Sequence, residues 1–192
     1  MNHDVTIRAA TVADAQAMHD IYAYYVENTA LNYDYEAPSV AYFEKKIACI
    51  LTHYPALIAE ADGEVIGYCY ANQFRDMEAY AWGPETTIYL KPGTYRRGLG
   101  RQLYTLLEDI LKSQGFVKMI AVLTTPIDER SDMGSLQFHE RLGFVEVGHM
   151  DHCGYKFGRW YSTTWMEKMI GEPKDDMVKP LDFDGVREQF GL

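Results

Sequence analysis

The segment from Ile88 to Leu111 constrains the fold most, because it joins a short apolar strand, a glycine-bearing basic turn and an amphipathic helix. From Leu99 onward, apolar residues recur with the spacing of one helix face, at Leu103, Leu106, Leu107, Ile110 and Leu111. The turn therefore delivers the first backbone N–H groups of a helix, which have no partner inside that helix.

The turn itself has the composition of an anion site. Helix N-termini attract negative charge, and this one is surrounded by Arg96, Arg97 and Arg101. Gly98 and Gly100 lack a Cβ atom, so the backbone can approach an anion closely and adopt the positive φ of an N–H nest. The turn has neither the Gly-Lys-Ser/Thr of a Walker loop nor the G-x-G-x-x-G of a dinucleotide site. From these residues alone it is either a pyrophosphate cradle or an ordinary strand–turn–helix joint.

Composition narrows the class of protein. The 192 residues, of which 47% are hydrophobic, suffice for one compact domain. A net charge of −10 argues against nucleic acid and anionic membranes as partners, so the arginine-rich turn favours a small anionic ligand. The three cysteines have no C-x-x-C spacing, which predicts neither disulfides nor a metal site, and no apolar run approaches about 18 residues. We therefore expect a cytoplasmic protein.

The remaining pattern predicts an α+β fold in which a mixed, mostly antiparallel sheet has helices on both faces. Thr11 to Asp14 is a capping box before a helix, and a second helix is expected after Ser39. Asp62-Gly63 predicts a hairpin with a type I′ turn. The stretch 78–90 is expected as a strand broken at Trp82-Gly83-Pro84, just before Glu85. Further elements are a strand over 119–123, a helix over 134–142 and paired strands over 144–150 and 160–166.

The C-terminal part of the chain has a different composition. Beyond Gly171 it becomes polar and proline-bearing, so we divide the chain into a domain over residues 1–170 and a tail over 171–192. The tail is expected either to be mobile or to pack on a neighbouring subunit through Leu181, Phe183 and Phe190.

Several segments carry a resemblance to a known family. The turn R-x-x-G-x-G before a helix resembles the acetyl-CoA site of the GNAT superfamily of N-acyltransferases. Across most of residues 5–168 the chain is similar to its phosphinothricin and methionine-sulfoximine acetyltransferase group, in segments that include Leu31-Asn32-Tyr33, Tyr54 to Glu60, Phe74-Arg75, Ala79 to Trp82, Glu85 to Leu90, His139-Glu140, Leu142 to Phe144 and Gly154 to Trp160.

The resemblance implies a three-layer GNAT-like fold, acetyl-CoA as co-substrate and, as is common in the family, a homodimer. Two positions of the coenzyme site depart from the family: Tyr95 replaces the usual Gln or Arg, and the loop before residue 134 lacks the usual Asn, whose place Asp132 takes. The implied coenzyme-binding residues are Ile88, Tyr89, Leu90, Tyr95, Arg96, Arg97, Gly98, Leu99, Gly100, Arg101, Asp132 and Ser135.

Glu85 and His139 are the implied catalytic residues. An amine with a pKa near ~10 is protonated at pH 7 and needs a base before it can attack a thioester. Glu85 matches the family's base, and partial burial would raise its pKa toward neutrality. His139 either protonates the departing thiolate or binds the substrate; from its sequence alone it is equally a helix-surface histidine. Backbone N–H groups near Ile88 are the candidates for holding the oxyanion.

The acceptor pocket is implied to include Arg75, since a guanidinium grips a carboxylate or phosphinate with two hydrogen bonds. The group commonly has a second arginine two residues later, where this chain has Met77. The other implied acceptor residues are Tyr33, Phe74, Tyr80, Trp82, Tyr155 and Lys156.

The expected activity is acetyl transfer to the amine of a small amino-acid-like molecule by direct attack. No cysteine or serine has the context of an activated nucleophile. The alternatives are acetylation of a peptide N-terminus or polyamine, and a catalytically silent acyl-CoA-binding regulatory module.

Overall fold

The structure is a computed structural model that describes residues 5–94, 98–131 and 134–192. Its strands form a seven-stranded sheet in the order β1-β2-β3-β4-β5-β7-β6. Neighbouring strands are antiparallel except β4 and β5, which run parallel. The strands are β1 Val5–Ala9, β2 Ala56–Ala61, β3 Glu64–Asn72, β4 Glu85–Leu90, β5 Lys118–Thr124, β6 Val145–Lys156 and β7 Arg159–Met169.

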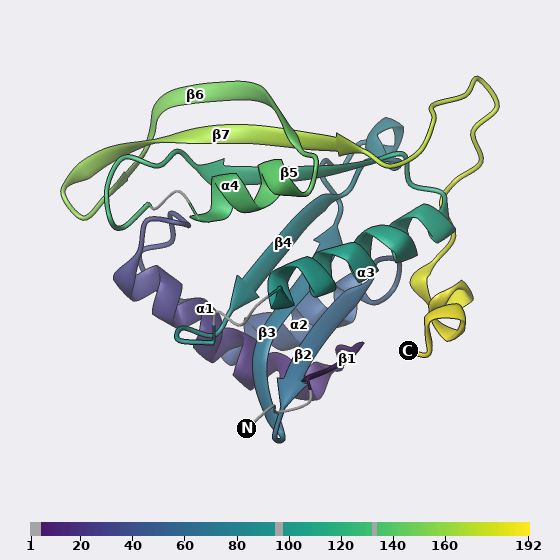
Figure 1. The fold of residues 1–192 in the computed structure, drawn as a ribbon, viewed down its shortest axis with the longest axis horizontal. Coiled ribbons are helices and arrows are strands. Elements are labelled where there is room, and N and C mark those ends of the chain that lie inside the picture. Colours follow the sequence, from purple (N-terminus) through teal and green to yellow (C-terminus); the bar gives the residue numbers. More distant parts are fainter. Residues whose placement is uncertain (1–4, 95–97, 132–133) are drawn as a thin grey trace.

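The sheet opens between β4 and β5. These two strands pair at a single position, Glu85 with Ile120. Figure 1 shows that beyond this point β1–β4 and the β5, β7, β6 group diverge. Both strands therefore expose backbone and side chains to the gap between them.

Helices cover both faces of the sheet, as expected. Buried residues of α1 and α2 pack with Ile58, Tyr68 and Tyr70 on one face, and α3 and α4 pack on the other with Leu57 and Cys69. No helix in the described part of the chain is long and apolar enough to cross a membrane. The α-helices are α1 Ala15–Asn28, α2 Val40–Ile50, α3 Leu99–Gln114 and α4 Gly134–Arg141; the 3-10 helices are η1 Val12–Asp14, η2 Glu78–Tyr80, η3 Phe183–Gly185 and η4 Arg187–Phe190.

Most local signals are confirmed, and one is wrong. Asp62 and Gly63 both have positive φ, 53° and 78°, as the predicted hairpin requires. The predicted strand from Glu78 does not form: residues 78–80 are the 3-10 helix η2, and β4 begins only at Glu85. The side chains of η2 are exposed, so no buried face holds this stretch to the sheet.

The segment after Gly171 packs on its own chain. Phe183 is fully buried in the α3-side core, and Figure 1 shows this segment folding back beside the C-terminal end of α3. The Gln114 side-chain amide donates to the carbonyls of His53 and Leu181 at 2.8 and 2.6 Å, and the Trp82 indole donates to the Val178 carbonyl at 2.8 Å. Phe183 is therefore not available to a neighbouring subunit in this arrangement.

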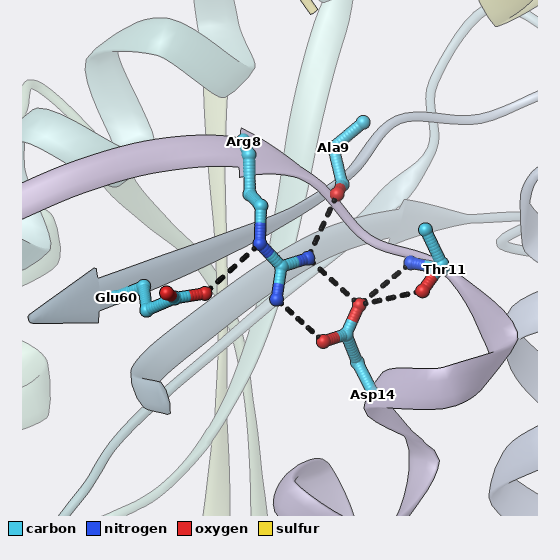
Figure 2. A network of polar contacts seen from close by, with 5 residues as sticks. All are labelled: Arg8, Ala9, Thr11, Asp14 and Glu60. Carbon is cyan, nitrogen blue, oxygen red and sulfur yellow. Dashed lines mark hydrogen bonds and ion pairs between the residues drawn. The ribbon is translucent and has the colours of Figure 1, made fainter. Parts of the chain in front are cut away.

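A polar network fixes the start of the fold (Figure 2). The Arg8 guanidinium donates to both oxygens of Asp14 at 2.9 and 2.7 Å and to Glu60 at 3.1 Å. Asp14 also accepts the backbone N–H of Thr11 at 2.7 Å, which closes the predicted capping box. Burial opposes ionisation of Asp14, but the hydrogen bonds from Arg8 and Thr11 outweigh it and lower the pKa of Asp14. The network joins β1, β2 and the turn that enters α1.

We expect Asp14→Asn to lower the free energy of unfolding at neutral pH by about 1–2 kcal/mol, a charge-assisted value reduced because Arg8 is partly exposed. A carboxylate with a lowered pKa stabilises the fold above its unfolded pKa and loses that effect as pH falls through its folded pKa. The difference between wild type and variant should therefore shrink below about pH 4. Urea titrations at pH 7 and pH 3 check this; an equal difference at both would contradict it.

Candidate active site

A cavity with a volume of about 1120 Å³ lies where β4 diverges from β5. Its walls come from α1, the segment after it, α2, β3, β4, β5, β7, the N-terminal part of α3 and the length of α4. It brings together many of the residues selected from the sequence: Tyr33, Glu85, Ile88, Tyr89, Leu90, Gly98, Leu99, Gly100, Arg101, Ser135 and His139.

Alternation along β4 divides the cavity into two sides. Tyr89 packs with the α1–α2 core and Ile88 with the α3 core. Because successive strand residues point to opposite faces, Glu85 lies on the α1–α2 side and Thr86 on the α3 side. We name them after the ligands that the resemblance implies, the first as the acceptor side and the second as the coenzyme side. The gap beside β4 connects them.

Glu85 is half-buried at the start of β4. Burial raises the pKa of its carboxyl, and the positive charges of Lys46 and Arg75 oppose this without cancelling it. A carboxylate with a raised pKa is a stronger base and is better matched to proton transfer near neutral pH.

His139 lies in a buried hydrogen-bond chain on the coenzyme side. Its Nδ1 is 2.8 Å from the carbonyl oxygen of Ser135, which only accepts, so Nδ1 carries the proton and Nε2 is an acceptor. Nε2 is 3.3 Å from the hydroxyl of Tyr104, and that hydroxyl is 3.1 Å from Thr86 Oγ1. Thr86 donates to the Ile120 carbonyl at 3.1 Å. The Tyr104 O–H therefore has two acceptors, Thr86 and His139.

Burial determines the protonation states of His139 and Tyr104 in this hydrogen-bond chain. It lowers the pKa of His139 to about 4, against the opposing effect of the Ser135 carbonyl. Burial also raises the pKa of Tyr104. At neutral pH the imidazole is uncharged and the phenol keeps its proton.

We expect His139 to show no titration between about pH 5.5 and pH 8, the range in which an unperturbed imidazole changes charge. NMR of ¹³C-labelled histidine checks this, with the His139 signal assigned by its loss in His139→Gln. A midpoint inside that range would contradict the buried, neutral assignment.

The start of α3 has the geometry expected of the glycine turn in one respect and departs from it in another. Gly98 has a φ of 92°, in the left-handed region, and precedes the first helical residue. Gly100, for which positive φ was also expected, is helical; a Cβ there would lie 3.1 Å from the Phe138 ring. Its small size makes room for α4. Tyr95, Arg96, Arg97 and Asp132 lie outside the described residues.

Six residues predicted for the acceptor pocket do not line this cavity. Phe74, Tyr80 and Trp82 line a smaller one of about 350 Å³ with β5 and β7. Arg75 is exposed, although its positive charge acts to lower the pKa of Glu85. Tyr155 is also exposed, and Lys156 is buried, donating to the carbonyls of Thr29 and Asn32 at 2.9 and 3.2 Å.

Comparison with known proteins agrees with this geometry. The model of the acetyltransferase (GNAT) domain matches residues 7–165. The chain belongs to the GNAT acetyltransferase family.

Its relatives include a phosphinothricin N-acetyltransferase of Streptomyces viridochromogenes, 34% identical over 164 residues that cover 85% of this chain and 87% of the relative. An L-methionine sulfoximine/L-methionine sulfone acetyltransferase of Salmonella typhimurium is 31% identical, covering 88% and 96%. The crystal structure of a GNAT phosphinothricin acetyltransferase from Sinorhizobium meliloti with acetyl-CoA superposes with a TM-score of 0.82 at 34% identity, covering 92% of each chain. The expected fold class and superfamily are confirmed.

The cavity of this GNAT chain also contains residues that were not selected from the sequence, and three of them interact with Glu85 or His139 directly or through one hydrogen bond. Tyr104 lies beside the leucine stripe of α3, and its polar tip on an apolar face was a usable signal. Lys46 lies beside the buried Phe43 and Ile47 of α2, so it too is a polar group next to an apolar helix face. Thr86 had no such signal, because its importance depends on contacts with α3 and β5.

Proposed function

We propose that this chain transfers an acetyl group from acetyl-CoA to the amine of a small amino-acid-like molecule, of the phosphinothricin or methionine-sulfoximine kind. The observation that carries the proposal is one cavity that joins a half-buried carboxylate, Glu85, to a glycine-capped helix N-terminus at α3. The names of the relatives support this acceptor class.

The coenzyme side suits the pantetheine and pyrophosphate of coenzyme A. Gly98 and Arg101 line the cavity beside the first turn of α3, where N–H groups favour phosphate. A volume of about 1120 Å³ suits a ligand of that size together with a small acceptor. Bound acetyl-CoA supplies the acetyl thioester.

On the acceptor side, Glu85 takes the proton of the substrate ammonium. Its raised pKa favours this transfer, directly or through one water. The free amine then attacks the acetyl carbon directly, and no side chain of the enzyme carries the acetyl group. The C–S bond breaks to release coenzyme A as its thiolate, and the new amide nitrogen gives up its second proton to water.

The backbone of Ile88 is the donor that we propose for the oxygen that gains negative charge. Lys91 N–H donates to the Ile66 carbonyl, so the odd residues of this segment pair with β3. The even residues direct their N–H groups toward the gap beside β5. A donor fixed in a strand needs little rearrangement during attack.

On the coenzyme side, we propose that the Tyr104 hydroxyl donates a hydrogen bond to the departing sulfur. Tyr104 has one O–H proton, so the hydroxyl turns from its two acceptors, Thr86 Oγ1 and the unprotonated His139 Nε2, when it donates to the sulfur; beforehand these two acceptors position it. Because a thiol has a pKa near ~8.5, the raised pKa of Tyr104 favours a hydrogen bond to the thiolate over full proton transfer.

The test is release of free coenzyme A thiol from acetyl-CoA in the presence of single amines. Phosphinothricin, methionine sulfoximine and methionine sulfone are the leading acceptors, with a dipeptide and spermidine for the two alternative amines. Turnover with the first group supports the proposal. Turnover only with the others would replace the acceptor, and thermal stabilisation by acetyl-CoA without any turnover would favour the silent binding module.

A cytoplasmic location, a homodimer and the division at residue 170 stay predictions. Cell fractionation and analytical ultracentrifugation test the first two, and limited proteolysis tests the third.

A further inference from the structure

The acceptor side of the cavity contains a lysine that the sequence patterns did not single out. Lys46 stands at the rim of the α2 face whose buried residues include Phe43 and Ile47, and its side chain lines the cavity. Its ammonium lies 4.8 Å from the centre of the Tyr70 ring, which also lines the cavity. Such contacts hold a cation over an aromatic face. Lys46 is therefore oriented toward the cavity.

The charge of Lys46 is not neutralised by an ion pair with any residue in the described part of the chain. Among the residues that the structure describes, no carboxylate lies within ion-pair distance of its ammonium. Burial lowers the pKa of Lys46, but Tyr70, Tyr42 and Glu85 outweigh it and raise the pKa overall. The side chain therefore stays positive at neutral pH.

The two charged groups on the acceptor side have opposite signs. Glu85 and Lys46 both line the cavity, and each lies near enough to alter the titration of the other. The other described cations of the cavity wall, Arg101 and Arg141, belong to α3 and α4 on the coenzyme side. A zwitterion with its ammonium at Glu85 and its carboxylate at Lys46 matches this distribution.

We propose that the Lys46 ammonium binds the α-carboxylate of the acceptor, and so selects free amino acids over their amides and over simple amines. This inference rests on the proposed function and assigns the residue that recognises the acid group. It supplies a cation to the acceptor side of the cavity, which is lined neither by the exposed Arg75 nor by Met77, the residue at the position of the second arginine.

The experiment compares L-methionine sulfone with its carboxamide as acceptors for wild type, Lys46→Met and Lys46→Arg. Lys45→Met is the matched control, because Lys45 is the preceding residue of α2 and is exposed. We expect Lys46→Met to raise KM for the acid by about 10- to 100-fold, as for a lost hydrogen bond to a charged group, with little change for the amide. Lys46→Arg should retain most of the preference, and Lys45→Met all of it.

The pair of acceptors separates recognition from an effect on Glu85. Loss of the Lys46 charge also raises the pKa of Glu85 further, but that effect changes the turnover of acid and amide by the same factor. Equal factors for both acceptors, or an unchanged KM for the acid, would overturn the assignment while leaving the proposed function intact.

If the wild type shows no turnover, calorimetry is used instead to measure the binding of the same two compounds in the presence of coenzyme A. There the proposed function fails, and tighter binding of the acid that is lost in Lys46→Met still supports the Lys46 assignment. A wild type that binds neither compound, or binds both equally, overturns it.

Discussion

Glu85→Gln should lower kcat/KM by ~10²-fold or more, the contribution usual for a general base. Glutamine has nearly the shape of glutamate, so the cavity and its acceptor side remain, but the amide cannot take the ammonium proton. The loss should fall on kcat more than on KM, because the proton is transferred after binding. Steady-state kinetics with methionine sulfone and acetyl-CoA check this result.

The pH profile gives the second signature of the same change. Only ionised Glu85 accepts a proton, so kcat of the wild type should fall as pH drops through its raised pKa. Glu85→Gln should lack that acidic limb. Glu44→Gln, an exposed position of α2, is the matched control and should behave as wild type. A rate for Glu85→Gln equal to that of the control would discard Glu85 as the base.

Phe183→Ala should destabilise the protein by about 3–5 kcal/mol, the range for removing a buried aromatic side chain. Phe183 is fully buried among the residues that pack against α3, although it lies in the polar C-terminal segment. The truncation removes apolar contacts and leaves a cavity in that core. Urea denaturation, with the slope checked for a two-state transition, measures the loss.

Leu181→Ala is the control for this variant, since Leu181 is 57% exposed two residues earlier. It should change the free energy of unfolding by no more than about 0.5 kcal/mol. Similar losses for both variants would mean that the segment contributes through chain connectivity or its backbone contacts, and that burial of Phe183 is not the cause.

Local chemistry made much of the fold predictable. The capping box at Thr11, the turn at Asp62-Gly63 and the leucine stripe of α3 each depend on neighbours within a few residues, and each formed as expected. The strand expected from Glu78 failed because its apolar residues have no buried partner. The sequence places Phe183 in a polar tail, because the core residues that it contacts lie far away along the chain.

The candidate site was predictable only in part for the same reason. Glu85, His139 and the glycine turn are identifiable from motifs, and they line one cavity. The polar contacts of the Tyr104 hydroxyl with Thr86 and His139 join α3, β4 and α4, and no spacing along the chain indicates them. Phe74, Tyr80 and Trp82 carry the resemblance, but the strand break before Glu85 directs them to a different pocket.

Under the proposed function, the opening between β4 and β5 leaves recognition of the two substrates to different parts of the polypeptide. The cavity wall on the proposed acceptor side comes from α1, α2 and the odd residues of β4, and the wall on the proposed coenzyme side comes from α3, α4 and the even residues. Substitutions in the first set can change which amine is accepted while the residues that bind the acyl donor stay the same. The architecture thereby permits new acceptor preferences to evolve while the donor stays constant.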